Sequence, residues 1–424
     1  RSRMSWRRGC AYRNRMLAFM AFFIAFIYLS SLFASHVTLL VNETNRRLST
    51  DYAQLAQPPR PCHCYRSDGD EEPMCYTRPD NGNDTGRQFS CESTVLLEEL
   101  DLLSTHKKDV DFEMLEFPVI VTAASSSHFQ HSTRLIYKLR KFYPDIKVIF
   151  YNLGLSPAQL SDLFQVCGIE VRDFNFLMYP DYVRRLHEYR WKPLIIAEVL
   201  KDYDSLWYMD SSVVPRKGHL EAVPELIRCR DRYKDTYFPP VEVRDRREET
   251  DVHESSFDEL AHSKNVRECM KYSLLLNGWT GHGIYAATEP SMYAFFPSNY
   301  TELRKPKAKM YEAGVAYVVK TNEVTADVLK WWVLCALEQD CMAPPGAQTT
   351  CFFDQTDRFT AYAGCHRYDQ SALNLLLANV NHYDRHYYTS NIVDFFSVKR
   401  DIEEDEIRDL SSLSCQRPML VNNV

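Results

Sequence analysis

The sequence lacks the short motifs that mark several large enzyme classes. No GxxxxGK[ST], GxSxG or HExxH occurs, so nothing supports an NTPase, a nucleophile-elbow hydrolase or a zinc protease. The turn after the first predicted strand, residues 123–128, has no GxGxxG and therefore no dinucleotide fingerprint.

The main body of the chain also lacks an excess of lysine and arginine over acidic residues. The first fifteen residues hold six arginines and no acid, and because the net charge is -7, the remainder carries -13. This balance gives no reason to expect a nucleic-acid partner.

Charge is also absent from Met16 to Val41, which contains no Asp, Glu, Lys or Arg. A helix needs about 20 consecutive, mostly apolar residues to cross a membrane, and this uncharged run is long enough. The preceding arginines predict a cytosolic N-terminus. The alternative is a cleaved signal peptide, but its apolar region is typically about 7–15 residues, and no clean small-x-small cleavage site follows here. We therefore expect a cytosolic tail at 1–15 and a signal anchor at 16–41. The protein would be a single-pass type II protein of the Golgi or another secretory-pathway membrane.

The cysteines and sequons agree with export. There are thirteen cysteines, and twelve of them follow the apolar run, an even number that suits disulfides in an oxidising compartment. We expect Cys335 to pair with Cys341 or a neighbour. Four further cysteines should pair among themselves, because C-x-C spacing is poor for the alternative, a zinc site: Cys62, Cys64, Cys75 and Cys91. Three N-x-S/T sequons predict glycosylation at Asn42, Asn83 and Asn299.

The pattern of the chain divides the exported part into three. Residues 42–115 are rich in proline and polar residues and predict a cysteine-containing stem, 116–390 a folded domain, and 391–424 a tail without clear pattern. In the domain, apolar β-branched runs alternate with helical patterns: strand 117–125, helix 128–143, strand 146–154, helix 157–168, strand 169–176, helix 182–203 and strand 205–214. Such alternation predicts an α/β fold with an open, mostly parallel sheet.

The strongest candidate site lies where the strand SLWYM runs into Asp210. In open parallel sheets, ligands gather at the carboxyl ends of the strands. A carboxylate there is well placed to hold a divalent metal on a diphosphate. The alternative is that Asp210 only caps a turn, as aspartate often does. The pattern alone does not decide between these two readings.

Three phrases resemble known motifs. RWKPLIIAEVLKDYDSLWYMDSSVV resembles the region around the DxD motif of GT-A-fold glycosyltransferases, EAGVAYVVKT resembles their substrate-side N-x-G strand, and HRYDQSALN resembles their D-Q-x-x-x-N phrase. The layout resembles a nematode-expanded family of uncharacterised type II membrane proteins related to nucleotide-diphospho-sugar transferases. The resemblance implies a GT-A-like fold and Mn²⁺ or Mg²⁺ as cofactor. It also implies a nucleotide sugar as donor and a glycan, protein or lipid as acceptor.

The resemblance also implies roles for individual residues. Asp210 matches the first acid of the DxD, and Ser212 replaces the second acid; because a hydroxyl is a poorer ligand for a hard cation, we expect weak metal binding. His382 is the candidate for a further metal ligand, and Lys192 could neutralise the diphosphate. Both have plainer alternatives, as a surface or core histidine and as a solvated lysine.

The remaining site residues come from the two later phrases. Gly314, Gln370 and Asn374 match donor-side positions, although Ala313 stands where the family often has asparagine. Asp369 and Glu312 are the candidate catalytic acids, either of which could deprotonate an acceptor hydroxyl. The sequence thus predicts a Golgi-type glycosyltransferase. The alternative is a non-catalytic lumenal protein that descends from the same fold and binds glycans or partner enzymes, and the D-S-S phrase is its best support.

Overall fold

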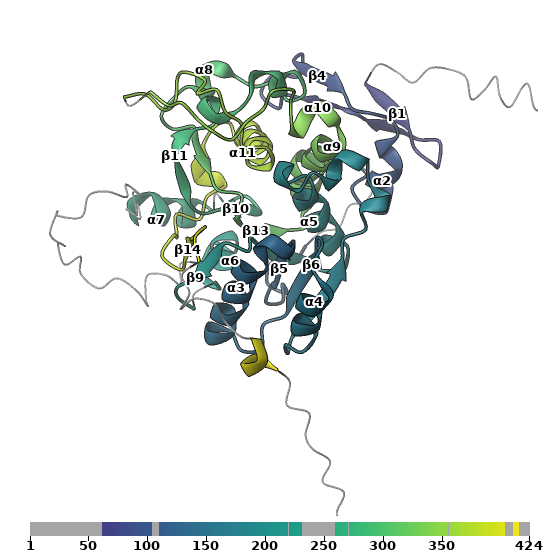
Figure 1. The fold of residues 1–424 in the computed structure, drawn as a ribbon. Helices are drawn as coiled ribbons and strands as arrows, with labels where there is room; N and C mark the ends of the chain where they lie inside the picture. Colours follow the sequence, from purple (N-terminus) through teal and green to yellow (C-terminus); the bar gives the residue numbers. More distant parts are fainter. Residues whose placement is uncertain are drawn as a thin grey trace, which may run out of the picture. The chain divides into compact units, whose positions relative to one another are not determined.

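The computed structural model describes residues 62–103, 110–218, 220–230, 259–269, 271–354, 356–402 and 410–414 (Figure 1). Among these residues, none of the helices has the length and apolar character needed to cross a membrane. The predicted tail 1–15, anchor 16–41 and sequon at Asn42 lie outside the described residues.

The helices and strands are short and follow one another closely. The α-helices are α2 (Ser93–Glu99), α3 (Phe129–Phe142), α4 (Pro157–Phe164), α5 (Trp191–Asp202), α6 (Ala222–Ile227), α7 (Glu259–Glu268), α8 (Tyr300–Leu303), α9 (Lys330–Leu337), α10 (Gln339–Met342) and α11 (Asp369–Val380). The strands are β1 (His63–Tyr65), β2 (Glu71–Pro73), β3 (Cys75–Thr77), β4 (Thr85–Gln88), β5 (Val119–Ala124), β6 (Val148–Asn152), β7 (Ile169–Asp173), β8 (Ser205–Met209), β9 (Val213–Pro215), β10 (Leu274–Leu276), β11 (Trp279–Gly283), β12 (Lys309–Tyr311), β13 (Val315–Val319) and β14 (Phe396–Val398).

A six-stranded sheet of order β10-β13-β8-β5-β6-β7 forms the centre of the fold. Strand β5 pairs in parallel with β6 and β8, and β6 pairs in parallel with β7, whereas β13 runs antiparallel to both β8 and β10. The predicted succession of strands and helices from β5 to β8 is confirmed, and so is the mostly parallel sheet. Two helices are markedly shorter than predicted: α4 ends at Phe164 instead of 168, and α5 begins only at Trp191 because 3-10 turns occupy Asp181–Arg184 and Leu186–Glu188.

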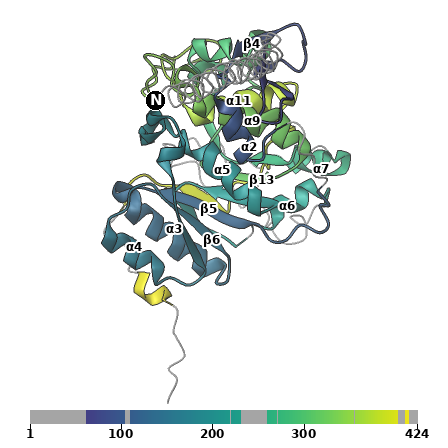
Figure 2. The same cartoon turned by 90° about the vertical axis from the view of Figure 1, so that its right-hand side faces the viewer.

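Helices cover both faces of this sheet. Side chains alternate between the faces of a strand, and in β5 Val121 packs in one buried cluster with Ile195 of α5, while Ile120 packs in another with Leu135 and Leu139 of α3. Figure 2 shows α3 and α4 on one side of β5 and β6, with α5 on the other. The near-continuous apolar runs of the strands follow from this burial on two faces.

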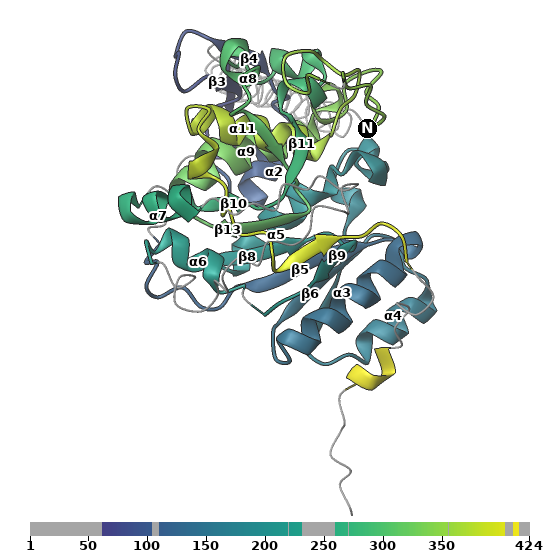
Figure 3. The same ribbon diagram turned by 90° about the vertical axis from the view of Figure 1, so that its left-hand side faces the viewer.

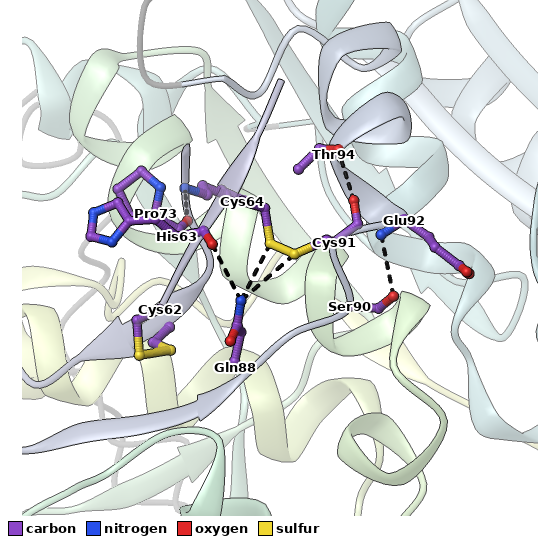
Figure 4. Close-up of a disulfide and its surroundings, with 11 residues drawn as sticks. Cys62, His63, Cys64, Pro73, Gln88, Ser90, Cys91, Glu92 and Thr94 are labelled. Carbon is purple, nitrogen blue, oxygen red and sulfur yellow. Dashed lines mark hydrogen bonds between the residues drawn. A yellow bond between two sulfur atoms is a disulfide. The ribbon is translucent and has the colours of Figure 1, made fainter. Parts of the chain in front are cut away.

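Disulfides hold the segment that precedes the sheet. The four cysteines predicted to pair among themselves do so, as Cys62–Cys75 and Cys64–Cys91. Figure 4 shows the second of these bonds, with the side-chain amide of Gln88 pointing at both sulfurs, 3.4 and 3.6 Å away. The other pairs that the structure describes are Cys229–Cys269, Cys335–Cys341 and Cys351–Cys365. The predicted Cys335–Cys341 bond is therefore confirmed.

The segment predicted as a stem packs into the domain over its described part. Tyr76 and Phe89 are buried against Phe296 and Trp331 with ring centroids 5.3 to 6.1 Å apart. Adding a Cβ at Gly86 would place it 2.0 Å from a backbone oxygen of the main domain, so the two backbones are in direct contact. The predicted boundary at 116 therefore separates no structural units. Tyr76 and Phe89 are core residues of the same domain as the sheet.

The predicted tail 391–424 also contributes structure over its described residues. Strand β14 pairs antiparallel with β9, which places Ser397 opposite Val214. Figure 3 shows β14 beside β9 on the side of α3. A 3-10 turn at Leu410–Leu413 packs on α3 and α4, and the amide of Cys167 donates to the carbonyl of Leu413. The chain therefore returns to the sheet after α11.

Candidate functional site

The topology of the sheet creates a crevice at β5 and β8. From β5 the chain proceeds to β6 and β7 on one side, and it then returns to β8 on the other side of β5. In open α/β sheets, ligands bind outside the carboxyl ends of the strands at such a switch point. Ala124 is the last residue of β5 and Asp210 directly follows β8, so both residues lie at this crevice.

Two cavities adjoin this switch point. The first, which we name the β5 cavity, has a volume of about 520 Å³ and is lined by Ala123, Ala124 and Ser125 at the end of β5. The second, which we name the α11 cavity, has a volume of about 680 Å³ and is lined by residues 367–370 at the start of α11. Four residues line both cavities and place them side by side: Tyr189, Asp210, Ser212 and Arg400.

At the α11 cavity, a buried lysine contacts two carboxylates. The Lys192 ammonium lies 3.2 and 3.4 Å from the two carboxylate oxygens of Asp210 and 2.7 Å from Oδ2 of Asp369. Its exposed fraction is 2%, and that of Asp369 is 4%. These residues come from α5, from the end of β8 and from the first turn of α11, so the fold brings together three segments that are distant in the sequence.

The charges of this group depend on one another. Burial lowers the pKa of Lys192, but the nearby Asp210 and Asp369 more than offset it and raise that pKa above its usual value. Burial raises the pKa of Asp369 to about 6, while Lys192 opposes this shift. Lys192 is therefore charged at neutral pH, and Asp369 is ionised there because its positive partner is adjacent.

Neighbouring groups fix the Asp210 carboxylate. The Tyr208 hydroxyl donates to Oδ1 over 2.7 Å, and the Asp210 amide donates to the carbonyl of Gly314 over 2.8 Å. Gly314 has no side chain, and a Cβ at this position would lie 2.9 Å from Oδ2 of Asp210. Glycine at position 314 thus has a steric reason, because a side chain there would meet the Asp210 carboxylate.

The residues at this site do not fit a divalent cation. Both oxygens of Asp210 contact the Lys192 ammonium, and Ser212 offers a neutral hydroxyl where the DxD motif has its second acid. The third predicted ligand, His382, is exposed and lines neither cavity. Within the described ranges, no group of three or more His, Cys, Asp or Glu side chains is arranged to hold a metal ion. A hard cation takes several oxygen ligands, and this donor set supplies too few.

The other predicted residues divide into two groups. Glu312 and Gln370 line the α11 cavity together with Gly314. Asn374 is fully buried one helical turn beyond Gln370, and its side chain bonds both the amide and the carbonyl of Tyr311 at 2.7 Å. The structure thus gives Asn374 the task of holding β12 against α11, and its position does not support the predicted contact with the donor.

The two described sequons lie in different settings. Asn83 is exposed in the turn between β3 and β4. Asn299 is half-buried and caps α8, where its side chain accepts from the amides of Thr301 and Glu302. Glycosylation at these positions stays a prediction.

The cavities contain cationic and aromatic residues that the sequence did not single out. Phe353 stacks on His282 with ring centroids 4.9 Å apart, and the Arg358 guanidinium lies 5.4 Å from the centroid of Phe353. Burial lowers the pKa of His282 to about 4, so this ring is neutral at pH 7. Two further arginines line the α11 cavity, Arg367 and Arg400. No local motif marks these residues, because the contacts that bring them together are long-range.

Two cavity-lining tyrosines adopt backbone conformations that are unusual for a side-chain-bearing residue. Tyr189 has φ 54° and ψ 21°, and Tyr368 has φ 46° and ψ -116°. Such conformations cost about 1–3 kcal/mol each and gather at functional sites, where the surrounding fold imposes them. Here they immediately precede the segments that carry Lys192 and Asp369.

Part of the chain is similar to a family of proteins. A family model described as "Protein of unknown function (DUF1647)" matches residues 62–197, which is less than half of the chain. The matched segment runs from the first disulfide into α5 and crosses the predicted boundary at 116. No curated protein matches.

Glycosyltransferases of low sequence identity are among the solved structures that match. The galactosyltransferase LgtC in complex with donor and acceptor sugar analogues is 14% identical, with 64% of this chain and 72% of LgtC covered and a TM-score of 0.29. The bifunctional glycosyltransferase WbbM is 10% identical, with 67% and 40% covered and a TM-score of 0.30. GlyE of Streptococcus pneumoniae TIGR4 is 13% identical, with 65% and 45% covered and a TM-score of 0.26. Likenesses this weak support no conclusion about activity.

Proposed function

We propose that this protein is a glycosyltransferase that moves a sugar from a nucleotide sugar to a glycan, protein or lipid acceptor. The observation that carries the proposal is the contact of Lys192 with Asp210 and Asp369 at the switch point of the sheet. Each residue belongs to a phrase that resembles a glycosyltransferase motif, and the three meet beside one cavity. Buried charge is costly, and a charged cluster that opens onto a cavity is typical of a functional site.

The two cavities suggest separate positions for donor and acceptor. The β5 cavity, at the end of the first parallel strand, suits the nucleoside, because ligands of such sheets bind there. The sugar would then lie near Asp369 and Gln370 at the α11 cavity. The far wall of this cavity, with His282 and Phe353, offers an aromatic surface on which an acceptor ring can pack.

We assign the role of general base to Glu312. It lines the α11 cavity and is half-buried, so an acceptor in the cavity can reach it, whereas Asp369 is only 4% exposed. In the transfer, the acceptor hydroxyl oxygen bonds to the anomeric carbon and its proton passes to Glu312. The bond from the anomeric carbon to the diphosphate oxygen breaks, and the diphosphate leaves with the electron pair. Asp369 and Lys192 hold the donor in position for this step.

We also propose that the protein works in the lumen of the secretory pathway, on a single-pass anchor. The disulfides that the structure describes support an oxidising compartment, since such bonds are rare in the cytosol. The Golgi membrane and the type II orientation remain predictions from the sequence.

The test is the hydrolysis and transfer of sugars from a panel of UDP-, GDP- and ADP-sugars. We expect turnover by the wild type, and a fall in kcat of about a hundredfold or more for Glu312→Gln with little change in KM. Asp181→Asn, which alters a fully exposed acid, is the control and should match the wild type. Nucleotide binding without turnover on any donor would contradict the enzyme and support the non-catalytic alternative.

A further inference from the structure

The strand β14 brings the chain back to the β8 end of the crevice. It pairs with β9, which begins three residues after Asp210. Immediately after β14, the amide of Lys399 donates to the carbonyl of Ser212 over 3.0 Å. The residues that follow β14 are therefore attached to the D-S-S phrase itself, and Arg400 lines both cavities.

Helix α3 holds the same segment from the other side. The guanidinium of Arg134 donates to the carbonyl of Lys399 over 2.7 Å and to that of Asp401 over 3.0 Å. A ring nitrogen of His131 lies 2.8 Å from the carbonyl of Arg400. Arg134 is only 1% exposed, so a buried charged side chain is used to hold this short piece of backbone. Such an arrangement fixes the backbone from which the Arg400 side chain extends into the crevice.

Arg400 and Arg367 have like charges near each other, and within the described part of the chain neither has a carboxylate partner. The positive charge of Arg400 contributes to a lowered pKa of Arg367, whose main cause is burial. Among the residues that the structure describes, neither arginine forms an ion pair. The α11 cavity is lined by four cations, Lys192, Arg358, Arg367 and Arg400, and by three carboxylates, Asp210, Glu312 and Asp369. This leaves an excess of positive charge beside the position where the donor is expected.

We propose that Arg400 and Arg367 bind the diphosphate of a nucleoside diphosphate or its sugar, and that they replace the divalent cation implied by the DxD resemblance. The inference rests on the proposed function. The planar guanidinium suits phosphate because it donates two parallel hydrogen bonds, and it stays charged at every relevant pH. The replacement of the second acid by Ser212 then favours diphosphate binding, because a second carboxylate there would repel the diphosphate. Lys192 neutralises Asp210, whose negative charge would otherwise also repel the diphosphate.

The experiment is calorimetry of the full chain with pyrophosphate, UDP, GDP and ADP, in buffer with EDTA and in buffer with Mn²⁺. Pyrophosphate reports on the diphosphate site whichever base the donor carries. We expect at least one of these probes to bind with a Kd that differs by less than about twofold between the buffers. Arg400→Gln should weaken this binding by about tenfold or more. Arg216→Gln, which alters an exposed arginine directly after β9, is the matched control and should bind like the wild type.

The outcomes separate this inference from the proposed function. Binding that appears only with Mn²⁺ would overturn the replacement of the metal and leave the glycosyltransferase standing. Unchanged binding by Arg400→Gln would overturn the role of this arginine. Absence of binding for every probe in both buffers would overturn the inference and the proposed function together. Arg400 is exposed, so circular dichroism of Arg400→Gln should match the wild type and exclude misfolding as the cause of a loss.

Discussion

At the scale of single residues, the site depends on side chains that hold one carboxylate still. Tyr208 and Lys192 both contact the carboxylate of Asp210. Gly314 has no side chain and so leaves room for this carboxylate. The backbone conformation at Gly314 does not require glycine, since its φ lies outside the left-handed region. Its small size is what matters, because any side chain would meet an acid that cannot move away without losing its partners.

We therefore expect Gly314→Ala to weaken diphosphate binding. The new Cβ would push Asp210 away from the Lys192 ammonium, so the Asp210 charge would repel the diphosphate, and we expect binding about tenfold weaker. The overpacking itself should cost about 1–3 kcal/mol in the free energy of unfolding. Calorimetry with UDP or pyrophosphate measures the effect, and urea unfolding checks the stability. Gly82→Ala is the control, because a Cβ there meets nothing within 4 Å. Wild-type affinity in Gly314→Ala would show that the position of Asp210 is not critical.

At the scale of elements, one disulfide-closed loop forms the far wall of the α11 cavity. The Cys351–Cys365 bond spans a sequence separation of 14 and encloses Phe353 and Arg358, which both line the cavity. The carbonyl of Arg358 accepts from the amide of Gly283 in β11 over 2.9 Å. The loop is therefore fixed at its ends by the disulfide and in its middle by β11.

Removal of this bond should loosen the acceptor side alone. For Cys351→Ala with Cys365→Ala, we expect a loss of about 3 kcal/mol in the free energy of unfolding, the value typical for a loop of about 15 residues. Limited proteolysis should cleave faster within 351–365, while pyrophosphate binding stays unchanged. The control, Cys62→Ala with Cys75→Ala, should also lose stability but leave cleavage of this loop unaffected. Weaker pyrophosphate binding in the first variant would mean that the loop also supports the diphosphate side.

Sequence patterns predicted the elements far better than the tertiary contacts between them. The runs that form β5, β6 and β8 are apolar because helices cover both of their faces. This burial can be recognised in the sequence, because it leaves a continuous run of apolar residues. Strand β14 has only three residues, and nothing within them shows that their partner is β9. For the same reason, Arg400 could not be assigned to the site from the sequence.

The helix α11 illustrates a second limit. Its side chains are buried almost all round, so its pattern does not show which face meets the cavity. Asp369 and Gln370 line the α11 cavity, whereas Asn374, one turn later, bonds the backbone of Tyr311. A spacing of four residues placed Asn374 near Gln370, but only the structure shows what its amide contacts.

At the scale of the whole described domain, the disulfide-rich segment 62–103 is part of the core. The Lys330 ammonium of α9 lies 2.6 Å from a carboxylate oxygen of Glu72, and the two residues are 4% and 0% exposed. Burial lowers the pKa of Lys330, while Glu72 opposes that shift. This buried ion pair spans more than half of the sequence and joins β2 to the helices behind the sheet.

Breaking this pair should destabilise the whole domain. Glu72→Gln leaves Lys330 buried without its counter-charge, which typically costs about 3–5 kcal/mol. Urea unfolding should show this loss as one cooperative transition, because the segment and the sheet share a core. Glu99→Gln, an exposed acid on α2, should change little. A separate early transition would instead mean that 62–103 unfolds independently, as a stem would.

The position of Arg400 has a consequence for the order in which the protein is made. The central sheet is complete once Val319 has been synthesised, and most of the buried core once α11 has been added. Arg400 comes only afterwards, with β14. A ribosome that stops between these points releases a chain with nearly all of its hydrophobic core but without the cation that we assign to the diphosphate. Donor binding would then begin only when translation has passed Arg400, so prematurely terminated chains would not consume nucleotide sugar.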